Sequence, residues 1–146
     1  MSGLRNKDGT FSAPSFATIA RDPATGIATR EKWHNRYGEL HRANGPANIV
    51  RDPVTGVIVR EDWCKNRDLH RVDGPAAVVR DPTTGREAAL SWWKNGRLHR
   101  IDGPAVVERD VATGDVTLEE WYNNGKRVPR PRRPASAAFA RRFQPT

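Results

Sequence analysis

The sequence has a single cysteine and no long apolar run, and each shortage excludes a class of protein. Cys64 is the only cysteine among 146 residues, so no disulfide can form within the chain. A reducing setting is therefore expected, namely the cytoplasm of the producing or infected cell. No stretch approaches the roughly 18 apolar residues of a membrane-spanning helix. The first ten residues also lack the apolar segment of a secretory signal.

Apolar residues are scarce and turn-forming residues are plentiful. Hydrophobic residues make up 36% of the chain, which contains 12 Gly and 11 Pro. Such a composition favours many short strands over long helices.

Positive charge is concentrated at the C-terminus. The chain carries a net charge of +8, but after Gly125 there are seven basic residues and no acidic one. The first 125 residues are therefore nearly neutral, with 18 basic and 17 acidic groups. Attraction to nucleic acid or to another anionic surface is expected to act through this tail. The basic residues of the tail are Lys126, Arg127, Arg130, Arg132, Arg133, Arg141 and Arg142.

An Arg-Asp-Pro-x-Thr-Gly segment recurs along the chain. It stands at Arg21–Gly26, Arg51–Gly56 and Arg80–Gly85, and a fourth copy at Arg109–Gly114 has Val111 in place of Pro. Spacings of 30, 29 and 29 residues indicate stacked supersecondary units. Asp, Pro and Gly suit a tight turn, and alternating apolar residues flank each copy. Each unit is therefore predicted to be a β-hairpin with a bulge.

A second turn follows a tryptophan in each unit. Asn95-Gly96 and Asn124-Gly125 are strong hairpin signals, whereas Gly38 and Asn66-Arg67 are weaker variants. A repeated tryptophan is predicted to form the core of its unit, with a stacking platform for nucleobases as the alternative. The repeated tryptophans are Trp33, Trp63, Trp92 and Trp121.

The segment Leu-His-Arg-x-Asp-Gly-Pro-Ala joins one unit to the next. It occupies Leu69–Ala76 and Leu98–Ala105, and a variant occupies Leu40–Ala47. Equivalent residues of units that each add two strands lie roughly 10 Å apart, too far for three His to share one zinc. We expect His to pack on a tryptophan or to cap a turn carbonyl, and Arg to pair with Asp across the turn. The alternative is a row of Arg side chains that grips an anionic partner. The residues of this segment that recur are His41, His70, His99, Arg42, Arg71, Arg100, Asp73, Asp102, Gly74 and Gly103.

These patterns predict an all-β fold, a repetitive antiparallel meander of about four hairpin units of 29–30 residues. Residues 1–13 are predicted to be a flexible lead-in, 14–125 the repeat domain and 126–146 a flexible basic tail. Prolines at 129, 131 and 134 should stop the sheet, because proline cannot donate a ladder hydrogen bond.

The stretch Trp92–His99, followed by Gly103, resembles the MORN repeat: an aromatic residue, Asn-Gly, a polar residue and Gly on a β-hairpin. It is most similar to divergent MORN-like proteins of phages, large viruses and some bacteria. The resemblance covers about residues 14–125, although the 29-residue period exceeds the usual MORN unit. It implies an elongated antiparallel sheet used for protein–protein contact and dimerisation, and in some members for binding acidic lipids.

No catalytic constellation stands out. Glu31, Glu61 and Glu119 recur two residues before a tryptophan, which predicts a strand face paired with Arg on neighbouring strands. Enzymes rarely need the same group in every unit, and Cys64 lies at a variable position of the repeat. We therefore expect no enzyme activity, no metal site and no cofactor.

The expected function is the binding of a macromolecule, most simply a protein. Analogy with the phage and viral proteins suggests an inhibitor of a host defence protein. Binding of nucleic acid through the tail and the Arg and Trp rows is one alternative, and sequestration of a small ligand is another. A homodimer through the sheet edges is also expected. The residues predicted to contact a partner are Trp93, Lys94, Arg42, Arg71, Arg100 and Tyr122, with Cys64 at the matching position of the second unit.

Overall fold

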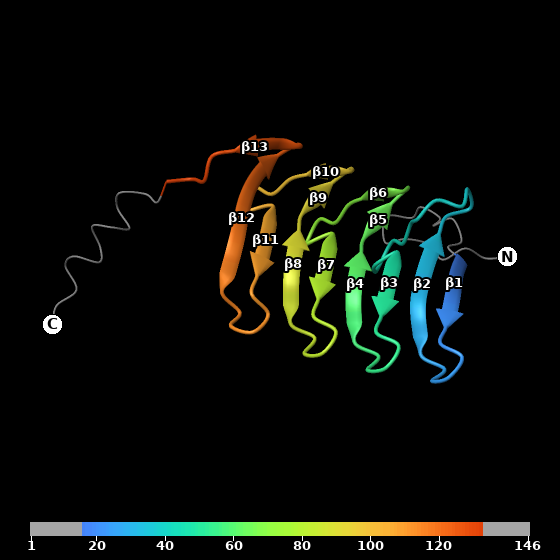
Figure 1. The fold of residues 1–146 in the computed structure, drawn as a ribbon. Coiled ribbons are helices and arrows are strands. Elements are labelled where there is room, and N and C mark those ends of the chain that lie inside the picture. The colour runs from blue at the N-terminus through green and yellow to red at the C-terminus, as the bar shows by residue number, and fades with distance from the viewer. Residues whose placement is uncertain (1–15, 133–146) are drawn as a thin grey trace, which may run out of the picture.

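The computed structural model describes residues 16–132, which form antiparallel strands and contain no helix (Figure 1). The main strands are β1 (Phe16–Arg21), β2 (Ala28–His34), β3 (Asn48–Arg51), β4 (Ile58–Asp62), β7 (Ala77–Arg80), β8 (Glu87–Ser91), β11 (Val106–Arg109), β12 (Val116–Asn123) and β13 (Lys126–Val128). Short strands form two small hairpins: β5 (Cys64–Lys65) with β6 (Asp68–Leu69), and β9 (Trp93–Lys94) with β10 (Arg97–Leu98).

The nine main strands form one sheet in the order β1-β2-β3-β4-β7-β8-β11-β12-β13. Four long hairpins stand side by side in a row, with their first turns at one end and the small hairpins at the other (Figure 1). The predicted all-β, antiparallel hairpin repeat is therefore confirmed. β1 lies at one end of the row, and β12 with β13 lies at the other.

The first turn of each unit is held by its aspartate. Asp52 Oδ1 accepts hydrogen bonds from the backbone N–H groups of Val54 and Thr55, at 2.9 and 2.8 Å, and from the Thr55 hydroxyl at 3.1 Å. These bonds favour the ionised carboxylate, so the N–H of Thr55 above all lowers the pKa of Asp52. Gly56 closes the turn with a φ of 74°, and the strand register shifts next to Arg51, which is the predicted bulge.

The second turn needs two consecutive residues with positive φ. Asn95 and Gly96 have φ values of 48° and 74°, as a type I′ turn requires. In the second unit Asn66 and Arg67 adopt the same geometry, with φ values of 47° and 76°. Arg67 thus takes a left-handed conformation that glycine takes in the next unit.

Small residues form the core. The buried apolar residues among those described are Ala47, Ile49, Cys64, Ala76, Val78, Ala105 and Val107. The repeated tryptophans, predicted to form the core of each unit, are partly buried and do not belong to this fully buried set. The physical reason is that no second layer of strands or helices covers the sheet between residues 16 and 132.

The sheet extends past the predicted domain boundary at residue 125. Lys126–Val128 form β13, which pairs with β12 through Trp121↔Val128. β13 therefore takes the place of β10 in the preceding unit, and the sheet stops just before Pro129. The predicted lead-in, residues 1–13, lies outside the described residues.

Candidate binding surface on the connectors

The Leu-His-Arg-x-Asp-Gly-Pro-Ala segments, or connectors, form hydrogen bonds to the next unit. In the connector Leu69–Ala76, His70 Nδ1 accepts a hydrogen bond from the backbone N–H of Asn95 at 3.0 Å. The Leu69 carbonyl accepts one from the N–H of Gly96, and the Arg71 N–H donates to the Trp93 carbonyl. The same three contacts recur at His41 with Asn66 and at His99 with Asn124. The histidine Nδ1 therefore accepts a hydrogen bond from a turn amide. The predicted contacts were packing on a tryptophan or capping of a turn carbonyl.

The connector arginine covers the tryptophan of its own unit. The Arg71 guanidinium carbon lies 3.7 Å from the centroid of the Trp63 ring, within cation–π range. Arg71 Nε donates to Asp73 at 3.1 Å, and Nη1 donates to the carbonyl of Pro75 at 3.2 Å. The guanidinium thus covers a face of the tryptophan ring that no second layer of strands or helices covers. Its hydrogen bonds go to residues of the same connector.

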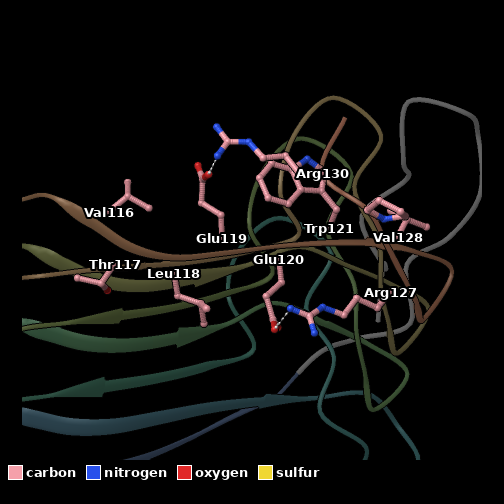
Figure 2. Close-up of a pocket in the computed structure, with 10 residues that line it drawn as sticks. Val116, Thr117, Leu118, Glu119, Glu120, Trp121, Arg127, Val128 and Arg130 are labelled. Carbon is pink, nitrogen blue, oxygen red and sulfur yellow. Dashed lines mark ion pairs between the residues drawn. The ribbon is translucent and has the colours of Figure 1, made fainter. Parts of the chain in front are cut away.

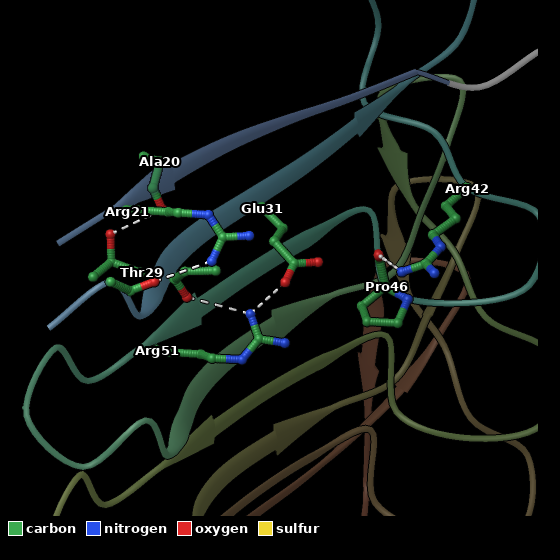
Figure 3. Close-up of polar contacts among 9 residues, drawn as sticks. Ala20, Arg21, Thr29, Glu31, Arg42, Pro46 and Arg51 are labelled. Carbon is green, nitrogen blue, oxygen red and sulfur yellow. Dashed lines mark hydrogen bonds and ion pairs between the residues drawn. The ribbon is translucent and has the colours of Figure 1, made fainter. Parts of the chain in front are cut away.

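The other two connectors repeat this arrangement. Arg100 lies 3.9 Å from the Trp92 ring and pairs with Asp102. Arg42 lies 4.1 Å from the Trp33 ring and donates to Pro46 (Figure 3), with Asn44 in the place of the aspartate. The predicted Arg–Asp pairs are confirmed at the two connectors that contain aspartate.

The connector glycine leaves room for the close approach of this arginine. A Cβ at Gly74 would lie 3.0 Å from Cζ of Arg71, and one at Gly103 would lie 2.8 Å from Cζ of Arg100. Neither glycine has a positive φ. A larger residue at these positions would therefore displace the guanidinium from its place on the connector.

The last unit lacks a connector but keeps the stacking. The Arg130 guanidinium lies 5.3 Å from the Trp121 ring. Arg130 also reaches Glu119 at 3.8 Å, and Arg127 pairs with Glu120 at 3.0 Å (Figure 2). Two basic residues of the predicted anion-binding tail are thus paired with acids. Lys126 and Arg132 are exposed, whereas Arg133, Arg141 and Arg142 lie outside the described residues.

The fourth position of each connector projects into solvent. Val72 is 92% exposed and Ile101 is 88% exposed. Asp73 and Asp102, which follow them, are also exposed. Neither apolar residue was predicted from the sequence as a contact residue, although each is β-branched and stands between Arg and Asp-Gly at a turn, where an apolar side chain is left exposed.

A groove of about 500 Å³ lies between these two connectors. Val72 and Ile101 are among its lining residues, as are Trp93 and Lys94. Trp93 is partly buried, and its indole N–H donates to Ser91 Oγ at 2.7 Å. The groove therefore combines apolar surface with lysine and aspartate charges, and it brings together four of the predicted contact residues: Trp93, Lys94, Arg71 and Arg100.

The residues that match Trp93 in other units do not form an exposed row. Cys64 is buried, and burial, with the negative charges of Asp62 and Asp68, raises the pKa of its thiol to about 11. Tyr122 is partly buried and donates to Glu120 at 3.3 Å. Trp93 and Tyr122, both predicted contact residues, are thus partly exposed, whereas Cys64 is not accessible.

The repeated glutamates pair with arginine across strands, as predicted. Glu31 contacts Arg51 at 2.5 Å, and Glu61 contacts Arg80 at 2.5 Å. Within residues 16–132 no group of three His, Cys, Asp or Glu side chains is arranged to hold a metal ion. The same part of the chain has no helix that could cross a membrane.

Fold and surface define an all-β hairpin-repeat protein. No match was found to a protein-family model, to a curated protein or to a solved structure.

Proposed function

We propose that this chain is a non-enzymatic protein that binds another protein through the groove between its second and third connectors. One observation carries the proposal: Val72 and Ile101 stand almost fully exposed on the rims of a groove that contains a tryptophan. Exposed apolar side chains beside aromatic and charged groups are typical of protein interfaces. Asp73 and Asp102 are already paired with Arg71 and Arg100, so the groove favours a partner that presents an apolar centre.

Affinity capture with paired variants tests this surface. The double substitution Val72→Glu with Ile101→Glu places two charges on the rims without changing the core. Val54→Glu is the matched control, because Val54 is 81% exposed in a first turn at the other end of its unit. Proteins captured from a lysate of the producing or infected cell by the unsubstituted chain should also be captured by Val54→Glu and should be lost with the double variant. Capture unaffected by the double variant would refute the groove as the binding site.

A narrower proposal, that the partner is a host defence protein which this chain inhibits, rests on the MORN-like resemblance alone. The identity of the captured protein tests it directly. The groove volume of about 500 Å³ also suits a small ligand. Native mass spectrometry of the purified chain would reveal such a ligand as added mass that the double variant loses.

Binding of nucleic acid is the second candidate function, and the exposed Lys126 and Arg132 favour it. Such binding should weaken steeply with salt, because each phosphate contact releases counterions. Substituting Lys126 and Arg132 by Glu should weaken it, whereas the groove variant should leave it unchanged. Equal affinity of the tail variant and the groove variant for single-stranded DNA or RNA would show that Lys126 and Arg132 make no contact with the nucleic acid.

A further inference from the structure

The three junctions between units share one strand register. β2 pairs with β3 through Glu31↔Ile49, β4 with β7 through Glu61↔Val78, and β8 with β11 through Leu90↔Val107. In each junction the second strand of one hairpin pairs with the first strand of the next hairpin. The first residue of each pair stands two positions before a tryptophan, and the residue opposite it is apolar and buried. The junction is therefore a repeated interface with fixed partners.

Side chains reinforce the first two junctions. Glu31 pairs with Arg51 of the next unit, and Figure 3 shows the two side chains meeting across the strands. The Thr25 hydroxyl donates to the carbonyl of Pro53 in the next first turn, at 3.2 Å. Glu61 with Arg80, and Thr55 with Pro82, repeat both contacts. The third junction has Leu90 and Val111 at these positions; there Arg86 Nη1 donates to the carbonyls of Val111 and Ala112, at 3.1 and 2.9 Å.

The two ends of the row each carry half of such a junction. Ile19 of β1 is 51% exposed, whereas its equivalents Ile49, Val78 and Val107 are 6%, 3% and 5% exposed. Within the described chain no strand pairs with the outer edge of β1. Arg21, the equivalent of Arg51, donates to the Gly26 carbonyl of its own turn at 3.0 Å.

The complementary half lies on β12. Its residues before Trp121 have no strand on their outer side among residues 16–132, because β13 pairs only with Trp121–Asn123. Glu119, the equivalent of Glu31 and Glu61, reaches Arg130 at only 3.8 Å. Val116 and Leu118 are 44% and 37% exposed, beside a groove of about 640 Å³ (Figure 2).

We infer that a second copy of this chain adds to the first head to tail, with β1 of one copy continuing the sheet from β12 of the other. The repeat register places Glu119 opposite Ile19 and within reach of Arg21 of the added copy. Thr113 then meets the carbonyl of Pro23, as Thr25 meets Pro53 within the chain. This contact buries Ile19 and supplies the missing ion pair.

A head-to-tail assembly keeps an unpaired β1 edge at one end and an unpaired β12 edge at the other, unless the rotation between successive copies closes a ring. Further copies can therefore add, and the average mass grows with concentration. A symmetric pairing of two β12 edges would offer Glu119 and Glu120 no basic partner on the facing strand, because β12 contains no Lys or Arg. The inference concerns a different surface from the connector groove and does not depend on the proposed function.

Sedimentation equilibrium of the full chain, from micromolar to millimolar concentration, tests the inference. The average mass should rise beyond that of a dimer. Arg21→Glu and Glu119→Arg should each weaken association by roughly 100-fold, because each opposes like charges at the joint. Lys65→Glu, an exposed substitution away from both edges, should leave it unchanged.

Mixing the two charge-reversal variants provides the decisive result. In an alternating assembly every joint contains one Glu and one Arg, so the mixture should associate while each variant alone stays monomeric. Circular dichroism of each variant establishes that it is folded. A chain that is monomeric throughout, a mass that stops at a dimer, or a mixture that fails to associate would overturn the inference and leave the β12 edge to residues 133–146 or to a strand of another protein.

Discussion

His70 Nδ1 accepts a hydrogen bond from the backbone N–H of Asn95, 25 residues further along the chain, at 3.0 Å. Because the lone pair of Nδ1 is the acceptor, the contact requires a neutral ring with its proton on Nε2. The bond joins the connector of one unit to the second turn of the next. Its recurrence at His41 and His99 shows that the connector histidine acts as a structural link between units.

Loss of this link should destabilise the repeat. His70→Ala removes the acceptor and leaves the Asn95 amide unpaired, so the free energy of unfolding should fall by about 1 kcal/mol. His70→Asn, whose Oδ1 lies near the position of Nδ1, should recover part of the loss. Urea unfolding followed by circular dichroism measures both values. An alanine variant as stable as the unsubstituted chain would contradict the structural role.

Stability should also fall as the pH drops below 6.5, the ordinary pKa of histidine. Burial, with the positive charges of Lys65 and Lys94, lowers the pKa of His70 below its ordinary value of 6.5. The unfolded chain therefore binds a proton more readily than the folded one. The contribution of His70 is fully present above pH 6.5 and is lost as the pH falls below it, until the folded pKa is reached. The midpoint of urea unfolding should fall over this range, and should fall less in His70→Asn.

The second turn of unit two stores strain. Arg67 holds a φ of 76°, where glycine stands in the equivalent Gly96. Since a left-handed conformation costs a non-glycine residue about 1 kcal/mol, Arg67→Gly should raise the free energy of unfolding by up to that amount. Arg67→Ala removes the same side chain but keeps the Cβ, so it serves as the control and should give no comparable gain. Equal stability of both variants in urea unfolding would show that the turn is unstrained.

Cys64 should resist alkylation in the folded protein. Its thiol is buried, and its pKa of about 11 leaves little thiolate near pH 8. Iodoacetamide should modify it slowly in native buffer and rapidly in urea, as followed by intact-mass measurement. The native rate then reports local opening between the first and second units, where the Arg42 N–H donates to the Cys64 carbonyl. Rapid labelling without urea would show that this junction opens readily.

The turns were predictable because their chemistry is local. Asp52 and Gly56 lie within one tight turn, and Asn95-Gly96 favours positive φ without help from the rest of the chain. Their fixed spacing then implies stacked hairpins. The pairing of glutamate with arginine on neighbouring strands also followed, because it repeats with the period.

Other features were not predictable, because they depend on distances between units. The partial burial of Trp63 beneath Arg71 results from the absence of a second layer. The pairing of β13 with β12 makes residues after Gly125 part of the sheet. Tail charges such as Arg127 are partly neutralised by acids that the sequence places apart from them.

The sequence by itself determined the hairpin, its period and the order of the units, because residues a few positions apart set each turn. The tertiary structure decided how histidine and arginine are used, with His70 reaching Asn95 and Arg71 covering Trp63. It also decided which apolar residues stay in solvent: Val72 at a connector, and Ile19 at a sheet edge where no preceding unit covers it. Solvent exposure depends on which strands and side chains lie beside a residue, and only the folded arrangement fixes those neighbours.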